Sequence, residues 1–293
     1  MYYRRKILLG LLEAMGGTSL KTDLQKLLFL VCREQDKAAY EFVPYKYGCY
    51  SFQVDSDKRT LTKYGLLNKS DSWTLKGKAK YCHLLRPSDR KIISEVLAQY
   101  GALKGKELIR EVYRAHPYYA INSEILSEVL RPSEVEDVEA ARPAATDASL
   151  FTIGYEGILL EAYLRRLDAN RVKVLCDVRR NPVSMKFGFS KNQLKNAANA
   201  LGINYLHLPE LGIESGKRRS LESASDYSEL FREYKSTTLK SQTVALDLIM
   251  RTVQRNGRVA LTCFEASHTQ CHRGCVSEAL ELNGLKKDQV AHL

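Results

Sequence analysis

The sequence predicts an α/β domain with a mostly parallel open sheet flanked by helices, preceded by a mainly α, winged-helix-like domain. Three observations lead to this fold class. The chain has 293 residues, 44% of them hydrophobic, which is enough for two cores. Its first 130 residues carry apolar side chains at helical spacing. From residue 150 onward, short apolar runs alternate with amphipathic helices, as in a parallel sheet.

An acidic stretch separates the two parts. Residues 1–132 carry 23 Lys and Arg against 14 Asp and Glu, residues 133–147 carry one against five, and residues 148–293 carry 21 against 15. The middle stretch is rich in small residues and bounded by Pro132 and Pro143, a composition typical of linkers. We therefore expect a recognition domain over 1–131, a linker over 132–147 and an α/β domain over 148–293.

The overall charge favours a polyanionic partner. The net charge is +11 and the isoelectric point is near 9.2, which favours double-stranded DNA as the partner. A lysine-rich surface without any such partner is the alternative. No apolar run approaches the ~18 residues of a membrane span, and the N-terminus lacks a clean signal peptide. Seven scattered cysteines do not form a disulfide framework, so we expect a cytoplasmic protein.

The elements of the first part follow the order of a winged helix. Apolar positions predict helices over 7–15 and 20–31, with Thr18 or Ser19 capping the second, and a further helix ending at Gly65. A hairpin of residues 66–67 and 73–75 then forms the wing. In winged helices one helix enters the major groove and the wing lies along the phosphates, although such domains also dock proteins. The expected phosphate contacts are the basic residues of this unit: Lys58, Arg59, Lys63, Lys69, Lys76, Lys78 and Lys80.

A tyrosine-rich segment lies between these helices. The run Phe42-Val-Pro-Tyr-Lys-Tyr-Gly-Cys-Tyr-Ser51 is interrupted by Pro44 and Gly48 and cannot form a regular helix. With the flanking helices and wing, it resembles the Panacea-type antitoxin domain over residues 5–115, although Cys49 stands where that loop often carries proline. The resemblance implies a module that neutralises a toxin or docks a protein partner.

In the second part, ionisable residues follow the ends of four expected strands. The strands are predicted over 150–154, 172–178, 203–208 and 258–264, and ligands of such sheets bind beyond the carboxyl ends of the strands. Tyr155 and Glu156 follow the first strand and Glu210 follows the third. Those at the other two strands are Asp177, Arg179, Arg180, Glu265, His268, Cys271, His272 and Arg273. This pattern predicts an active or binding site at that edge.

Four ordered motifs in this part carry a family resemblance. They are Thr152-Ile-Gly-Tyr-Glu-Gly157, Asp177-Val-Arg-Arg-Asn-Pro182 with Ser184, Tyr205-Leu-His-Leu-Pro-Glu-Leu-Gly212, and Cys263-Phe-Glu265 followed by Cys271-His-Arg273. Residues 150–285 thereby resemble the domain-of-unknown-function family 488 of bacteria and archaea. The resemblance implies the fold and a pocket but no settled reaction. Glu214 departs from the glycine that is common there.

The residue types at the strand ends suit cleavage of a glycosidic bond. Asp177 and Glu265 are two carboxylates, one able to stabilise an oxocarbenium-like state and the other to move protons. Arg179 and Arg273 could hold a phosphate, while Tyr155, Phe187 and Phe189 could stack an extruded base. The remaining expected binding residues are Glu156, Arg180, Cys271 and His272. The alternative is that Asp177–Arg179 and Glu265–Arg273 are ion pairs that fix loops.

The cysteine and histidine residues near the last strand allow other chemistry. Cys263, His268, Cys271, His272 and Cys275 have poor spacing for zinc, so no metal and no cofactor are expected. Cys271 at a helix start is a candidate nucleophile or part of an anion-binding loop. Neither a Walker loop nor a G-x-G-x-x-G motif occurs.

Our leading hypothesis is a DNA-acting enzyme that hydrolyses the N-glycosidic bond of a modified or damaged base, with the basic N-terminal domain binding duplex. The alternative is a non-catalytic DNA-binding regulator or antitoxin-like protein whose α/β domain senses a small anionic ligand. A small-molecule enzyme with an appended docking domain is a third possibility. Which base or ligand is recognised does not follow from the residues.

Overall fold

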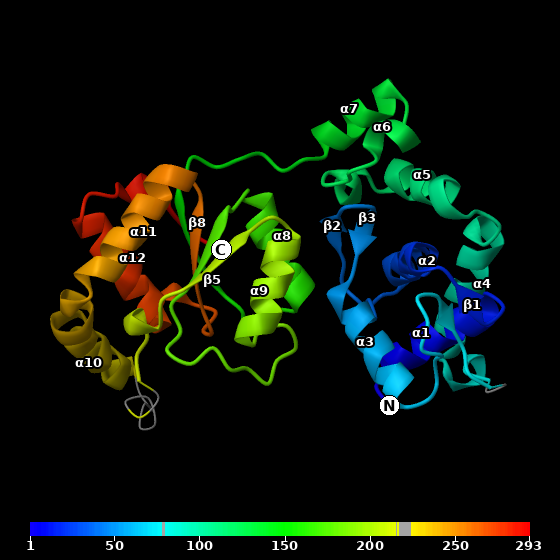
Figure 1. Ribbon diagram of the computed structural model, residues 1–293, viewed down its shortest axis with the longest axis horizontal. Coiled ribbons are helices and arrows are strands. Elements are labelled where there is room, and N and C mark those ends of the chain that lie inside the picture. The colour runs from blue at the N-terminus through cyan, green and yellow to red at the C-terminus, as the bar shows by residue number, and fades with distance from the viewer. Residues whose placement is uncertain (78–79, 215, 217–223) are drawn as a thin grey trace. The chain divides into compact units, whose positions relative to one another are not determined.

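A computed structural model describes residues 1–77, 80–214, 216 and 224–293 (Figure 1). The chain divides into two compact units, Met1–Arg142 and Pro143–Leu293, and each has its own hydrophobic core. Among the described residues, no helix combines the length and apolar character that crossing a bilayer requires.

The N-terminal unit is mainly helical, as the sequence predicts. Leu8, Leu11, Leu24 and Leu27 are fully buried where the first two helices meet, because helical spacing places them on facing sides. The helices are α1 (Tyr3–Ala14), α2 (Lys21–Glu34), α3 (Phe52–Lys63), α4 (Pro87–Tyr100), α5 (Gly105–Ala115), α6 (Leu126–Val129) and α7 (Pro132–Ala140).

A small antiparallel pairing follows α3, at the place expected for the wing. Strand β1 (Thr18–Ser19) pairs with β4 (Trp73–Thr74), and an isolated bridge joins Leu67 to Leu75. Thr18 and Ser19 were expected to cap α2, but they lie in β1 and Leu20 stands at the cap position. Trp73 is fully buried, so the wing is anchored to the helical core.

The tyrosine-rich segment forms a hairpin. Strands β2 (Val43–Tyr45) and β3 (Gly48–Tyr50) pair antiparallel around a turn at residues 46–47. Gly48 has φ +86°, and a Cβ there would lie 2.4 Å from Tyr113 Cε1, so the turn requires glycine. Lys26, almost fully buried in α2, donates to the carbonyl oxygen of Cys49 at 3.0 Å.

Much of the segment expected to be a linker is helical. Helix α7 occupies residues 132–140, because Pro132 starts it and the side chain of Glu134 accepts a hydrogen bond from the backbone N–H of Arg131 at 2.8 Å. Val138 is buried in a cluster with residues of α5 and α6. The structure therefore places α7 in the N-terminal unit, which extends to Arg142.

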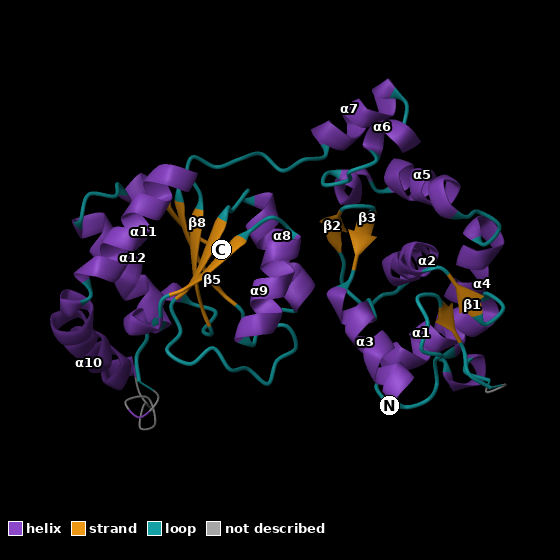
Figure 2. Ribbon diagram, viewed as in Figure 1, coloured by secondary structure: helices purple, strands orange, loops and turns teal. Residues whose placement is uncertain are grey.

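The C-terminal unit confirms the predicted α/β fold. Its five strands are all parallel in the order β7-β6-β8-β5-β9. Helices α11 and α12 cover one face and helices α8 and α9 the other (Figure 2). The elements are β5 (Leu150–Gly154), α8 (Leu160–Ala169), β6 (Val174–Asp177), α9 (Lys191–Ala200), β7 (Asn204–His207), α10 (Ala224–Tyr234), α11 (Thr243–Asn256), β8 (Val259–Cys263), α12 (His272–Leu282) and β9 (Val290–His292).

Strand β9 was not predicted, because Val290-Ala-His292 is too short to show a pattern. It pairs with β5 in register Thr152↔His292, and the hydroxyl of Thr152 lies 2.8 Å from His292 Nδ1. The His292 ring stacks on His268 with centroids 3.5 Å apart. Burial, followed by the nearby Arg273 charge, lowers the pKa of His268, and burial lowers the pKa of His292 in the same way.

These lowered pKa values predict a loss of stability in acid. Below about pH 6.5 both imidazole rings bind a proton in the unfolded chain, whereas in the folded unit they stay neutral to lower pH. Protonation therefore favours the unfolded chain, and the free energy of unfolding falls as the pH falls. We expect the free energy of unfolding of the C-terminal unit to fall between about pH 7.5 and 5.5. Replacing both rings (His268→Phe with His292→Phe) should reduce that dependence. The pH dependence is measured by hydrogen exchange of peptides from β5 and β9. An equal pH dependence in the wild type and the double variant would contradict this role of the two histidines.

Candidate functional site

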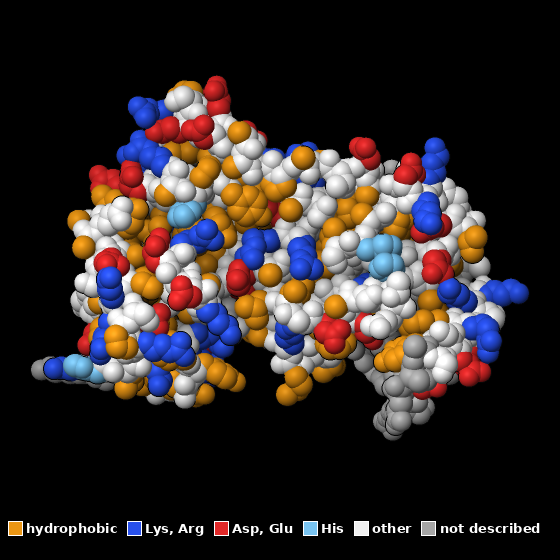
Figure 3. Space-filling model, turned by 180° about the vertical axis from the view of Figure 1, so that it is seen from behind, with side chains coloured by type: hydrophobic (Ala, Val, Ile, Leu, Met, Phe, Trp, Pro, Cys, Tyr) orange, Lys and Arg blue, Asp and Glu red, His pale blue; other side chains and the backbone are white. Residues whose placement is uncertain are grey.

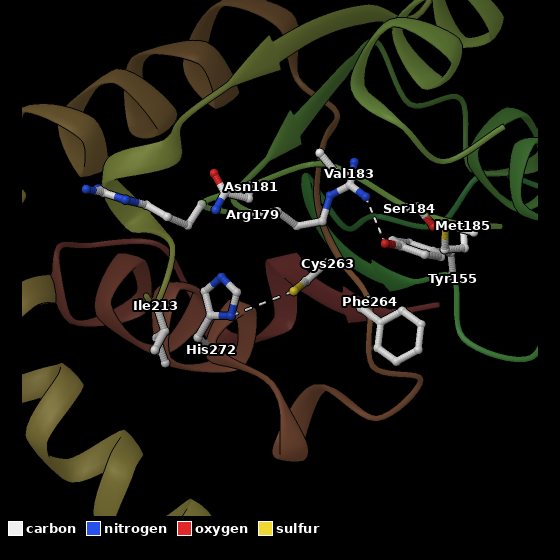
Figure 4. A pocket seen from close by; sticks show the side chains of 11 residues that line it. Tyr155, Arg179, Asn181, Val183, Ser184, Met185, Ile213, Cys263, Phe264 and His272 are labelled. Atoms are coloured by element: carbon white, nitrogen blue, oxygen red, sulfur yellow. Dashed lines mark hydrogen bonds between the residues drawn. The ribbon is translucent and has the colours of Figure 1, made fainter. Parts of the chain in front are cut away.

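A cavity of about 330 Å³ opens at the carboxyl ends of β5, β6 and β8 (Figure 4). The connections from β5 and β8 run to opposite sides of the sheet here, which is where open α/β sheets bind ligands. The last residue of β8, the first residue of α12 and the loops after β5, β6, β7 and β8 supply the lining residues: Tyr155, Arg179, Arg180, Asn181, Val183, Ser184, Met185, Ile213, Cys263, Phe264 and His272.

A buried ion pair between Asp177 and Arg179 lies beside the cavity. Asp177 ends β6 with no exposed surface, and Arg179 is 6% exposed. Arg179 Nε donates to Asp177 Oδ1 at 2.8 Å and Nη2 donates to Oδ2 at 2.5 Å, so the pair is bidentate. The Tyr205 hydroxyl of β7 donates to Oδ2 at 2.5 Å. Both carboxylate oxygens of Asp177 therefore already accept hydrogen bonds.

Arg179 also fixes the aromatic side of the cavity. Its Nη1 donates to the Tyr155 hydroxyl and to the Phe189 carbonyl oxygen, each at 2.8 Å. The Tyr155 ring stacks on Phe189 with centroids 4.2 Å apart and planes 9° apart. Burial lowers the pKa of Arg179, but the hydrogen bond and charge of Asp177 outweigh it and raise the pKa. Arg179 is thus a permanently charged anchor for the loop after β6.

Strand β7 holds this loop from its other side. His207 Nε2 lies 2.9 Å from the carbonyl oxygen of Arg179, and Lys191 Nζ lies 2.9 Å from His207 Nδ1. Burial and then the Asp177 charge raise the pKa of Tyr205, which keeps its proton available for the hydrogen bond to Asp177. Two side chains of β7 therefore hold the end of β6 and the loop that follows it.

The floor of the cavity contains thiol and imidazole groups. Cys263 ends β8, and its Sγ lies 3.7 Å from His272 Nδ1 and 3.3 Å from Glu265 Oε2. His272 begins α12, and its Nε2 lies 2.9 Å from the carbonyl oxygen of Val178. Cys271 Sγ lies 3.8 Å from the same Nδ1. Burial, and then the neighbouring Cys263 and Glu265, raise the pKa of Cys271 well above its usual value.

The loop after β8 is clamped through its backbone. Arg273 is 1% exposed, and it donates to the carbonyl oxygens of Glu265 at 2.6 Å and Ala266 at 2.8 Å. Glu156 Oε2 accepts a hydrogen bond from the N–H of Ala266 at 3.0 Å. A Cβ at Gly154 would lie 1.8 Å from the Glu265 carbonyl oxygen, so only glycine permits this approach.

The mouth of the cavity is apolar and exposed. Phe264 is 44% exposed, Val183 82% and Met185 103%, although all three line the cavity. Beside them Arg180 forms a long ion pair of 4.0 Å with Glu214, and its side chain is 46% exposed. The exposed apolar side chains and the half-exposed Arg180 at the mouth contrast with the buried, hydrogen-bonded residues beneath.

The structure brings only part of the predicted site together. Tyr155, Arg179, Arg180 and His272 line the cavity. Asp177 and Glu265 are not among the lining residues, although Glu265 Oε2 lies 3.3 Å from the Sγ of Cys263, which lines the cavity. The other expected binding residues lie elsewhere: Glu156 holds a loop, Phe187 is half-buried outside the lining, and Phe189, Cys271 and Arg273 are buried. Arg273 donates hydrogen bonds to the backbone carbonyl oxygens of Glu265 and Ala266 and so holds the loop after β8.

Several lining residues were not predicted from the charged residues at the strand ends. Asn181, Val183, Met185 and Phe264 directly follow residues that were identified, and Ile213 follows the Leu-Gly motif. The signal that could have found them is the run of large apolar residues in polar strand-end loops. Such residues are costly to expose and indicate contact with a ligand.

The basic residues of the N-terminal unit divide into two groups. Arg59, Lys63, Lys69, Lys76 and Lys80 are exposed, whereas Lys78 lies outside the described residues. Lys58 donates to the carbonyl oxygens of Ser70 and Asp71 at 3.0 and 2.9 Å, and it lies 5.1 Å from the centre of the Trp73 ring. Lys58 therefore ties α3 to the wing, and burial lowers its pKa.

Comparisons with known proteins bear on the C-terminal unit. A family model described as "Domain of unknown function DUF488" matches residues 159–280, which confirms the resemblance of this region. The matched region spans β6, β7 and β8 together with the cavity-lining loops that follow β6 and β8. No curated protein and no solved structure matches the chain. The Panacea-type resemblance of the first part is not supported by these comparisons and stays a prediction.

The buried pair gives a stability prediction. Asp177→Asn removes the charge that compensates the buried Arg179, so we expect a loss of about 3–5 kcal/mol in the free energy of unfolding. Glu214→Gln breaks an exposed pair and should change it by less than about 1 kcal/mol. The sole tryptophan, Trp73, lies in the N-terminal unit, so hydrogen exchange of β6 peptides is the suitable measurement. Equal effects of both substitutions would contradict this role of Asp177.

Proposed function

We propose that this protein acts on DNA and that the C-terminal cavity receives a single base extruded from the duplex, whose N-glycosidic bond it hydrolyses. The observation that carries the proposal is the composition of the cavity. An exposed aromatic ring and apolar side chains surround the mouth, while hydrogen-bonding groups lie within. A nucleobase has apolar faces and polar edges, so it matches both features.

Individual residues suit parts of a nucleotide. Phe264 and Met185 offer apolar surface for the faces of the base, in place of the buried Phe189. Asn181 and Ser184 offer hydrogen bonds to its edge. The exposed Arg180 suits a flanking phosphate, because guanidinium groups bind phosphate in a fork. A cavity of about 330 Å³ is within the usual range for small ligands.

Glu265 is the carboxylate that we assign to the chemistry. In the reaction a water oxygen bonds to the sugar C1′ while the bond from C1′ to the base nitrogen breaks, and the base keeps that electron pair. Glu265 accepts a proton from the water, and a proton from solvent neutralises the departing base. Asp177 is a positioning residue, because its oxygens are already bonded to Arg179 and Tyr205.

The test of the proposal is base release from duplex DNA. Labelled duplexes carrying a panel of modified and damaged bases are incubated with the full chain, and abasic sites are read by alkaline cleavage. We expect Glu265→Gln to slow cleavage by about 10²–10⁴-fold, since it removes the proton acceptor. Glu229→Gln on the exposed surface of α10 is the matched control and should retain full activity. Absence of cleavage of every duplex in the panel would overturn the proposed reaction.

One observation favours a second function. Because Asp177 is engaged by Arg179, the cavity does not present two free carboxylates, and a ligand-sensing domain needs only the cations. In this alternative the protein is a non-catalytic DNA-binding regulator or antitoxin-like protein that senses a small anionic ligand. Tight DNA binding without cleavage, unchanged in Glu265→Gln, would favour it.

DNA binding by the N-terminal unit has its own test. Figure 3 shows Lys and Arg side chains gathered over the lower part of this unit. Arg59 and Lys63 are exposed on α3. We expect the double substitution Arg59→Ala with Lys63→Ala to weaken duplex binding and to reduce the slope of log K against log salt by roughly 2, about 0.9 for each lost phosphate contact. Lys91→Ala on α4, an exposed partner of Glu95, should leave the slope unchanged. Equal slopes in all three proteins would exclude this surface.

A further inference from the structure

Two thiols and an imidazole converge on one point at the floor of the cavity. The ligand atoms of Cys263, Cys271 and His272 all lie within 4.8 Å of one another, and all three residues are buried. His272 Nδ1 is 3.7 Å from Cys263 Sγ and 3.8 Å from Cys271 Sγ (Figure 4 shows the first of these contacts). Three groups that bind soft metal ions therefore face a common centre.

The imidazole is held in the form that binds metals. His272 Nε2 lies 2.9 Å from the carbonyl oxygen of Val178. Because a carbonyl oxygen only accepts, Nε2 carries the proton and Nδ1 carries the lone pair that faces both sulfur atoms. Metal-binding histidines are typically oriented by such a hydrogen bond from their other nitrogen.

The spacing of the three atoms fits a tetrahedral ion. With Zn–S bonds of about 2.3 Å and a Zn–N bond of about 2.0–2.1 Å, tetrahedral angles place sulfur and nitrogen about 3.6 Å apart. The two observed distances, 3.7 and 3.8 Å, are within about 0.2 Å of that value. Ordinary packing of two cysteines and a histidine does not require this arrangement.

We propose that Cys263, Cys271 and His272 bind a zinc-type transition-metal ion whose fourth position opens onto the cavity. Cys263 and His272 both line the cavity, and three protein ligands with one open position are the pattern of catalytic zinc sites. An ion with an open position supplies Lewis-acid chemistry that activates water for hydrolysis.

The surroundings support the site electrostatically and mechanically. Two cysteine thiolates neutralise a divalent ion, which removes the cost of burying either charge alone. Arg273 fixes the backbone on both sides of the turn after Glu265, at the start of the loop that brings Cys271 back to Cys263. That loop, with a helical turn over His268–Gln270, explains why the linear spacing of the cysteines did not indicate a metal site.

Metal binding is testable without DNA, so it goes beyond the proposed function. The full chain is purified under reducing conditions, stripped with a chelator and titrated with Zn²⁺. We expect one tightly bound zinc per chain and a rise in melting temperature on binding. Mutation of a residue that only orients a metal ligand typically weakens metal affinity by about 10–100-fold. We therefore expect Cys263→Ser, Cys271→Ser and His272→Gln, which each remove a ligand, to weaken zinc binding by more than about 100-fold.

Cys275→Ser is the matched control. Cys275 is also buried and lies in α12 four residues after Cys271, but it lines a different cavity. We expect this variant to bind zinc as the wild type does. Wild-type protein that binds no stoichiometric zinc, or an equal loss in Cys275→Ser, would overturn the proposal.

A second measurement uses only the wild type and so does not depend on whether the variants fold. Titration with Co²⁺ should produce the charge-transfer absorption of thiolate-bound cobalt at one equivalent. Its absence, or a Cys263–Cys271 disulfide detected by mass spectrometry in the reduced preparation, would also overturn the metal site. If the protein binds zinc but releases no base, the metal site is supported and only the proposed reaction is contradicted.

Discussion

The candidate site depends on one buried ion pair. Asp177 and Arg179 are two residues apart at the end of β6, and their bidentate contact removes both charges from water. Burying either charge alone would be very costly, so each partner requires the other. Through Nη1, Arg179 donates hydrogen bonds to the Tyr155 hydroxyl and to the Phe189 carbonyl oxygen and so positions both groups. One ion pair thus joins the connection between β6 and α9 to Tyr155 in the loop after β5.

This arrangement separates residues that hold the site from residues that can meet a ligand. The hydrogen-bonded groups lie beneath the cavity, and the exposed side chains of Phe264 and Met185 lie at its mouth. A rigid floor with an exposed rim suits recognition of a planar, partly apolar ligand, because the polar groups are oriented before it arrives. Cys263, Cys271 and His272, which we propose as metal ligands, lie at the same floor.

The sequence was sufficient for the α/β fold, but not for which of the strand-end residues line the cavity. Apolar runs of five residues identified β5 and β8 because buried parallel strands show that pattern. Charged residues at strand ends indicated the edge of the sheet at which the cavity opens. Whether Asp177 faces a ligand or Arg179 depends on side-chain directions within a loop, which no periodicity encodes. The convergence of Cys263 with His272 likewise depends on how residues 264–271 fold back.

Extrusion of a base from the duplex into the cavity can be measured directly. A duplex carrying 2-aminopurine at or beside the target position gains fluorescence when the stack opens. Our account predicts that the full chain increases this fluorescence and that Phe264→Ala, which removes the exposed ring at the mouth, binds the duplex but loses the increase. Tight binding of the wild type with no change in fluorescence would contradict the account.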